Sequence, residues 1–147
     1  MATQDELKRI AAEKAVEFVP ENEYIGIGTG STINFFIEAL GKSGKKIKGA
    51  VSTSKKSSEL LARYDIPVVS LNEVSGLAVY IDGADEVNHA LQMIKGGGGA
   101  HLNEKIVASA SEKFVCIADE SKYVSRLGKF PLPVEVVESA RSLVSRR

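Results

Sequence analysis

Three turns in the sequence gather side chains that can do phosphate and acid–base chemistry. The first is Gly28-Thr29-Gly30-Ser31-Thr32, which separates a short apolar run from a helical apolar stripe. Glycines let the backbone approach an anion, and the start of a helix offers free N–H groups and a partial positive charge. The turn therefore predicts a phosphate site, although the same residues also suit a capped strand-to-helix turn that binds nothing.

The same turn argues against a dinucleotide site. A G-x-G-x-x-G fingerprint that starts at Gly26 or Gly28 needs a third glycine where Ser31 or Ile33 stands. The next predicted strand runs into residues 51–54, which include no Asp or Glu to hold a ribose diol. We therefore expect no NAD site and no other cofactor.

The second turn is acidic and follows the apolar run 77–81 directly. In Asp82-Gly83-Ala84-Asp85-Glu86, two carboxylates three residues apart can converge on one small polar ligand, one acting as an acid and the other as a base. The spacing also suits a divalent cation, but His89 and His101, the only histidines, have no partner at a recognised ligand spacing. We expect no metal site, and a solvated, Asx-capped turn is the alternative.

The third turn, Lys95-Gly96-Gly97-Gly98-Gly99-Ala100, holds four of the 13 glycines. Such backbone freedom costs conformational entropy, so it indicates close approach to a ligand or motion. The turn is not a P-loop, because Lys95 precedes the glycines and no Gly-Lys-Ser/Thr follows. Lys95 supplies a positive charge, and Glu104, at the start of the next helix, is a candidate base or a plain partner of the helix dipole. Lys122 is a candidate cation or a surface lysine.

Helices between these turns follow from capping and periodicity. Thr3 and Glu6 form a capping box that begins a helix ending near Pro20, with an apolar stripe made by Leu7, Ile10, Ala11, Phe18 and Val19. A second helix follows Thr32 and is closed by Gly41, a third is capped by Ser54, and a fourth carries the apolar residues of 102–110.

Strands are predicted between the helices, over residues 24–27, 47–51, 67–71, 77–81 and 114–117. Strands that alternate with helices are typical of an α/β protein. We expect a Rossmann-like three-layer domain with a mostly parallel sheet, whose ligands bind at the carboxyl ends of the strands. All three turns lie at such ends.

Composition limits the partners and the compartment. The 19 Lys and Arg balance the 19 Asp and Glu, so no net charge recruits nucleic acid or an anionic membrane. The apolar runs are short, the N-terminus is polar, and Cys116 stands alone, so we expect no membrane span, no secretory signal, no disulfide and a cytoplasmic protein.

A chain of 147 residues suits one domain. We expect residues 1–130 to form a catalytic α/β domain. Residues 131–147, with Pro131 and Pro133, are expected to be a connector and the start of a C-terminal subdomain that continues past Arg147.

Six motifs, in order along the chain, resemble ribose-5-phosphate isomerases of the A type. They are GIGTGST at 26–32, YIDGADE at 80–86, MIKGGG at 93–98, NEK at 103–105, ADESK at 118–122 and GKFPLPVE at 128–135. The resemblance implies metal-free interconversion of D-ribose 5-phosphate and D-ribulose 5-phosphate through an enediolate. It also implies a homo-oligomer, a dimer or tetramer, in the full-length form.

The resemblance also assigns roles. Glu104 is expected to move the proton between C2 and C1, Asp82 to assist ring opening, and Asp85 with Lys95 to handle the charge and proton at O1 and O2. The sugar phosphate is expected to contact Thr29, Gly30, Ser31, Thr32, Asp82, Gly83, Ala84, Asp85, Lys95, Gly96, Gly97, Gly98 and Lys122.

Other classes of function stay open on the sequence. One is a sugar-phosphate-binding sensor module, or a catalytically inactive fragment of the same fold, but such a sensor has no use for paired carboxylates and Glu104. Another is a related phosphosugar deaminase or a CoA-transferase-like enzyme, which the DGAD and KGGG turns fit less well. Calorimetry with ribose 5-phosphate beside an isomerase assay separates binding from turnover.

Overall fold

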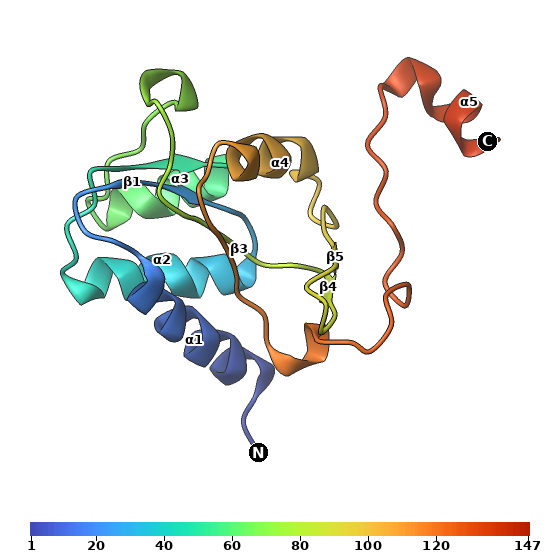
Figure 1. Ribbon diagram of the computed structural model, residues 1–147. Coiled ribbons are helices and arrows are strands. Elements are labelled where there is room, and N and C mark those ends of the chain that lie inside the picture. The colour runs from blue at the N-terminus through green and yellow to red at the C-terminus, as the bar shows by residue number, and fades with distance from the viewer.

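The computed structural model describes all 147 residues and has a parallel sheet of four strands at its centre. The strands are β1 (Tyr24–Ile27), β2 (Gly49–Ser52), β3 (Tyr80–Asp82) and β6 (Phe114–Cys116), in the order β2-β1-β3-β6 (Figure 1). A separate antiparallel pair joins β4 (Glu86–Val87) to β5 (Met93–Ile94). The strand order brings the ends of β1 and β3, which carry two of the predicted turns, side by side.

Five α-helices accompany the strands: α1 (Gln4–Ala15), α2 (Ser31–Ser43), α3 (Lys55–Arg63), α4 (His101–Ser109) and α5 (Arg141–Ser145). The predicted caps are confirmed, because Thr3 and Glu6 form a capping box at α1 and Ser54 accepts a hydrogen bond from Ser57 N at α3. Short 3-10 turns occupy Val16–Phe18, Leu71–Glu73, Glu120–Lys122 and Glu138–Ala140.

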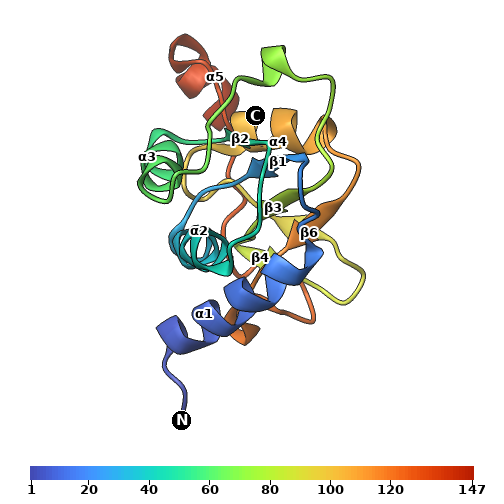
Figure 2. The same cartoon turned by 90° about the vertical axis from the view of Figure 1, so that its left-hand side faces the viewer.

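Both faces of the sheet are covered, so the predicted three-layer α/β fold is confirmed. On one face, Ile25 and Ile27 of β1 join a cluster of 16 buried residues that includes side chains of α1, α2 and α3. On the other face, Tyr80 of β3 packs with Val107 of α4 in a smaller cluster. Figures 1 and 2 show α2 and α4 on opposite sides of the strands. Alternation along each strand therefore decides which side chains face α4.

Two expectations about local structure are wrong. The second helix does not close at Gly41 but runs on to Ser43, and Gly44 ends it in the left-handed conformation with φ 75°. Gly41 instead allows close packing, because a β-carbon there would lie 2.4 Å from Cδ1 of Tyr64. Residues 67–71 form no strand: Val68 makes one isolated bridge to Ala50 before the chain turns.

The apolar stripe expected for the first helix is only partly correct. Ala12 and Ala15 form its buried face together with Val16 and Val19, whereas Ile10 is 60% exposed and Phe18 is 50% exposed. Small alanines allow α1 to approach α2 closely, which a larger side chain at either position would prevent.

The last residues of the chain extend away from the sheet and end in the short helix α5 (Figure 1). Large apolar side chains on this segment are exposed, among them Leu132, Val134 and Val137. The division into 1–130 and 131–147 stays a prediction. None of the helices has the length and apolarity that crossing a bilayer requires.

Candidate active site

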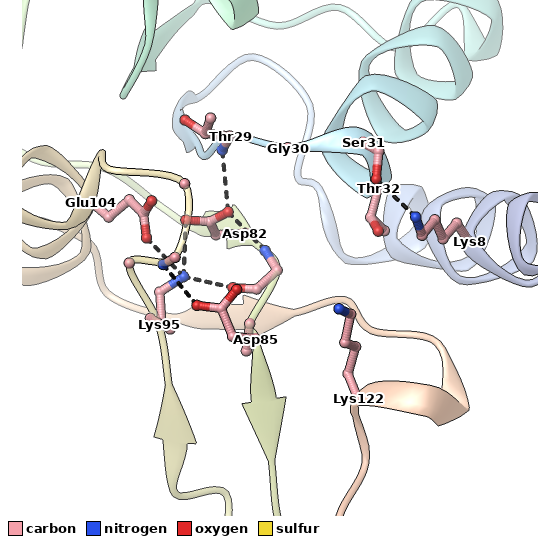
Figure 3. Close-up of a pocket in the computed structure, with 15 residues that line it drawn as sticks. Lys8, Thr29, Gly30, Ser31, Thr32, Asp82, Asp85, Lys95, Glu104 and Lys122 are labelled. Carbon is pink, nitrogen blue, oxygen red and sulfur yellow. Dashed lines mark hydrogen bonds and ion pairs between the residues drawn. The ribbon is translucent and has the colours of Figure 1, made fainter. Parts of the chain in front are cut away.

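A cavity of about 240 Å³ lies at the carboxyl ends of β1 and β3. Its size is below the ~300–1,000 Å³ of pockets that hold drug-sized ligands, so it suits a smaller molecule. Every site residue predicted from the sequence lines it, with one addition, Lys8 (Figure 3): Lys8, Thr29, Gly30, Ser31, Thr32, Asp82, Gly83, Ala84, Asp85, Lys95, Gly96, Gly97, Gly98, Glu104 and Lys122.

One end of the cavity is positively charged. Gly30, with φ 114°, precedes α2 and leaves the first N–H groups of that helix without a side-chain cap. Nζ of Lys8, from α1, donates to Oγ of Ser31 at 3.0 Å, and Lys122 lies on the same side of the cavity in Figure 3. Two ammonium groups and a helix N-terminus have the charge and the donors that suit a phosphate group.

Neighbouring loops hold this turn in place. The hydroxyl groups of Thr29 and Thr53 are 2.8 Å apart, and Oγ of Ser57 donates to the carbonyl oxygen of Gly28 at 2.8 Å. Thr53 follows β2 directly and Ser57 lies in the first turn of α3, so the segment after the second strand supports the turn after the first. The hydroxyl-rich stretch after β2 thus has a supporting role beside the cavity.

Lys122 belongs to the short 3-10 turn Glu120–Lys122, and Asp119 caps that turn. Oδ1 of Asp119 accepts a hydrogen bond from the backbone N–H of Ser121 at 2.9 Å. Burial would raise the pKa of Asp119, but hydrogen bonds from Ser121 and the nearby Lys122 leave it lowered. The negative Asp119 therefore orients a turn whose last residue faces the cavity.

Asp82 is the most heavily bonded carboxylate of the site. Oδ1 accepts from the backbone N–H of Thr29 at 3.2 Å and of Gly83 at 2.7 Å. Oδ2 accepts from Nζ of Lys95 at 3.1 Å and from the hydroxyl group of Tyr80. Four donors hold a side chain that is 1% exposed, so the carboxylate is fixed in one orientation.

Lys95 joins Asp82 to Glu104. Its Nζ lies 3.1 Å from Oδ2 of Asp82 and 3.1 Å from Oε1 of Glu104, and it also donates to the carbonyl oxygen of Gly83 (Figure 3). Burial disfavours the ammonium form, but the two carboxylates outweigh burial and raise the pKa of Lys95. Lys95 is thus a cation at neutral pH.

Glu104 lies on the first turn of α4 and is 6% exposed. Its burial and the negative charge of Asp82 raise the pKa of its carboxyl group, against the opposing effect of Lys95. A carboxyl group with a pKa closer to neutrality than usual is suited to take up and return a proton.

Asp85 is placed by the glycine run. Its Oδ2 accepts from the backbone N–H of Gly97 at 2.8 Å, and its own N–H donates to the carbonyl oxygen of Ile94. A β-carbon at Gly97 would lie 2.8 Å from Oδ1 of Asp85 and 2.7 Å from Cζ of Phe130, so a larger residue there would displace these side chains. Gly97 thus allows close packing of Asp85 and Phe130, while close approach to a ligand stays a prediction.

A buried carboxylate secures Phe130 beside this loop. Glu86 is 4% exposed and accepts hydrogen bonds from the backbone N–H groups of Gly128 at 2.9 Å and Phe130 at 3.1 Å. Phe130 in turn packs against Gly97. Glu86 therefore ties a distant segment of the chain to the wall of the cavity.

Sequence reasoning missed four residues of or around the site: Lys8, Tyr80, Glu86 and Phe130. Tyr80 left a signal, because it stands two positions before Asp82 on a strand and so faces the same side. Glu86 left one too, because it is the last residue of the acidic turn. Nothing in the sequence distinguishes Lys8 from other lysines on the polar face of its helix.

The remaining candidates take no part in the cavity. Burial raises the pKa of Cys116 to about 11, which favours the unreactive thiol. His89 is exposed, and His101 packs against Gly96. No group of three or more His, Cys, Asp or Glu side chains is placed to hold a metal ion.

The two ends of the cavity differ in chemistry. Ammonium groups and helix N–H groups at one end suit a phosphate, while Glu104, Lys95 and the aspartates at the other suit proton transfer. A base beside a cation can remove a proton next to a carbonyl group, because the cation stabilises the oxyanion that develops.

Comparison with known proteins agrees with this geometry. The sequence model of the family described as ribose 5-phosphate isomerase A (phosphoriboisomerase A) matches residues 49–147. The chain is 98% identical over 147 residues to ribose-5-phosphate isomerase A of Neisseria meningitidis serogroup C, and it spans 66% of the length of that relative.

Solved structures give the same result. The crystal structure of ribose 5 phosphate isomerase A from Neisseria gonorrhoeae is 98% identical, with a TM-score of 0.98 over 99% of this chain and 66% of that chain. A D-ribose-5-phosphate isomerase in complex with phospho-erythronic acid is 39% identical, with a TM-score of 0.94 over 99% of this chain and 66% of that chain.

Proposed function

The chain belongs to the ribose 5-phosphate isomerase A family, and we propose that it interconverts D-ribose 5-phosphate and D-ribulose 5-phosphate. The observation that carries the proposal is the position of Nζ of Lys95, which lies 3.1 Å from both Asp82 and the buried Glu104. The other end of the same cavity is lined by hydrogen-bond donors of Lys8, Lys122 and the turn 29–32, which suit a phosphate group. The reaction belongs to the aldose–ketose isomerisations of the pentose phosphate pathway.

Binding begins at the phosphate end. The phosphate ester accepts hydrogen bonds from the turn 29–32 and lies between Lys8 and Lys122. Anchoring this end places the carbonyl end of the open-chain sugar near Glu104 and Lys95. Fixed placement of the reacting atoms converts a slow encounter into a reaction within one complex.

Proton transfer follows at the other end. After Asp82 assists ring opening, the Glu104 carboxylate removes the proton from C2 of the aldose, and the C–H electron pair forms the C1=C2 bond of an enediolate. Lys95 and glycine N–H groups stabilise the negative oxygen, and Asp85 passes a proton between O2 and O1. Glu104 then returns its proton to C1, which gives the ketose.

The substitution Glu104→Gln tests this assignment. The variant keeps the size and position of the side chain but has no base, so we expect turnover to fall by roughly 10²–10⁴-fold while calorimetry still detects ribose 5-phosphate binding. Glu112→Gln, at an exposed glutamate just after α4, is the matched control. Full turnover in Glu104→Gln would overturn the role of the base.

An isomerase assay of the unmodified chain tests the activity itself. Conversion of ribose 5-phosphate supports the proposal. Binding without conversion identifies the chain as a sugar-phosphate-binding module or an inactive fragment, and ammonia release from an amino-sugar phosphate identifies a deaminase.

Two further features are part of the proposal. We place the reaction in the cytoplasm, because charged phosphate esters do not cross membranes unaided. We also propose that the full-length form is a homo-oligomer, a dimer or tetramer. Apolar side chains exposed near the C-terminus, such as Val134 and Val137, support association, and light scattering of that form measures it.

A further inference from the structure

We propose that Tyr80 is a positioning residue of this site, whose buried hydroxyl group locks the Asp82 carboxylate beside Lys95 and so controls the protonation of Glu104. The inference rests on the proposed function, because Tyr80 would act on the same acid–base groups. It adds a residue that lies behind the cavity and does not line it.

Strand geometry brings the two side chains together. Tyr80 and Asp82 are two residues apart on β3, so both side chains project toward the α4 face of the sheet. The Tyr80 ring is fully buried and meets the ring of Phe114 edge to face, with centroids 5.2 Å apart. From this fixed ring the hydroxyl group donates to Oδ2 of Asp82.

The adjacent strand leaves room for both side chains. A β-carbon at Gly26 of β1 would lie 2.8 Å from Cδ1 of Tyr80, and one at Gly28 would lie 1.9 Å from Cγ of Asp82. Gly26 of β1 therefore lies beside Tyr80 of β3, and Gly28, the residue after β1, lies beside Asp82. The two glycines admit the ring and the carboxylate to the same layer of the structure.

Packing alone does not require the hydroxyl group of Tyr80. A phenylalanine ring would fill the same space, and a buried hydroxyl group costs free energy unless it is hydrogen-bonded. Here its partner is a carboxylate of the site, and a hydrogen bond to a charged acceptor is stronger than a neutral one. We therefore assign the hydroxyl group to the control of Asp82.

Few other charged groups surround the pair. Lys95 follows β5, Glu104 lies on α4, and His101, at the start of α4, faces Glu104. From β6 only Cys116 faces them, and its raised pKa keeps it a neutral thiol. The charges of Asp82 and Lys95 thus act on the titration of Glu104 in addition to its burial.

Removing the hydroxyl group shifts the titration of Glu104 in one direction. In Tyr80→Phe the Asp82 carboxylate loses one of its four donors. Lys95 becomes the sole donor to Oδ2 and is drawn toward Asp82, away from Glu104. A weaker ion pair with Lys95 favours protonated Glu104, so we expect its titration midpoint to rise by about one pH unit.

Carbon-13 NMR of the glutamate side-chain carboxyl groups measures this midpoint directly. Glu104→Gln assigns the Glu104 signal, and the titration is recorded for the unmodified chain and for Tyr80→Phe. Tyr24→Phe is the matched control, because Tyr24 packs against the same small cluster and its hydroxyl group makes no hydrogen bond in the structure. A folded Tyr80→Phe variant with an unshifted midpoint overturns the proposal.

A second substitution, with the opposite expected effect on the Glu104 midpoint, tests the proposal if Tyr80→Phe does not fold. Replacing Tyr80 by 3-fluorotyrosine keeps the ring and makes the hydroxyl group a stronger donor, so the Glu104 midpoint should move down. A midpoint that stays or moves up overturns the proposal.

Neither titration requires turnover, so the two proposals fail separately. Absence of isomerase activity in the unmodified chain overturns the proposed function and leaves the NMR result standing. Where activity is present, the apparent pKa of the acidic limb in the plot of kcat against pH should rise by the same amount in Tyr80→Phe. KM should be less affected than kcat.

Discussion

Gly28 lies so close to Asp82 that a β-carbon added to the glycine would be 1.9 Å from Cγ of the carboxyl group. Gly28, in the turn before α2, therefore also packs against the Asp82 carboxylate. In Gly28→Ala the Asp82 side chain must move away from its four donors.

We expect Gly28→Ala to reduce turnover by at least 100-fold and stability by about 1–3 kcal/mol, the usual cost of overpacking. Steady-state assays and urea unfolding measure the two effects. The control is Gly76→Ala, where the nearest atom to a new β-carbon is 3.7 Å away. Equal behaviour of the two variants would contradict the steric explanation.

Stability should fall as pH rises above the range of ordinary carboxyl groups. The pKa of Glu104 is raised in the folded chain, so its contribution is fully present below the unfolded value of 4.5 and is lost as pH rises through the folded value. Urea unfolding between pH 4 and pH 8 should show the stability of the unmodified chain falling relative to Glu104→Gln. A difference that does not depend on pH rules out this linkage.

Lys8 should contribute to phosphate affinity and not to the chemical step. A hydrogen bond to a charged group contributes roughly 1.5–3 kcal/mol, so Lys8→Gln should weaken ribose 5-phosphate binding by about 10–100-fold and leave kcat nearly unchanged. Calorimetry provides the measurement. Lys14→Gln, on the exposed face of the same helix, is the control. Equal affinities for Lys8→Gln and the unmodified chain would remove Lys8 from the phosphate end.

Glu86 should stabilise the glycine loop from a distance. Glu86→Ala leaves the N–H groups of Gly128 and Phe130 without an acceptor, at a cost of about 1–3 kcal/mol for a buried donor. We expect faster hydrogen exchange at Gly97, which lies next to the Phe130 ring. The exposed Glu135→Ala is the control. Unchanged hydrogen exchange at Gly97 would show that the glycine loop is stable without the hydrogen bonds of Glu86 to Gly128 and Phe130.

Much of the fold could be predicted because turns and apolar runs are local signals. Tyr24–Ile27 was recognisable as a strand, since apolar residues end at a glycine-rich turn. The prediction that the second helix ends at Gly41 is wrong, because a glycine that ends a helix and a glycine that packs closely against Tyr64 look the same in a sequence. Residues 67–71 have the composition of a strand but make only one isolated bridge, to Ala50, which no local pattern reveals.

The site was predictable to the extent that parallel strands bring their carboxyl ends to one edge. That rule placed Thr29 and Asp82 together without coordinates. It says nothing of Lys8, which comes from a helix before the first strand, or of Glu86, whose partners lie more than 40 positions away. Such residues depend on tertiary contacts, which spacing does not encode.

The strand order β2-β1-β3-β6 also has a consequence for synthesis on the ribosome. β1 and β2 are synthesised early and can pair. The pocket also requires β3, which pairs with the edge of β1 opposite β2. Glu104 is synthesised after all three strands. The turn at residues 28–32 is therefore synthesised well before Glu104, which lies on α4. Sugar phosphate present during translation should stabilise the completed pocket and leave the pairing of β1 with β2 unaffected.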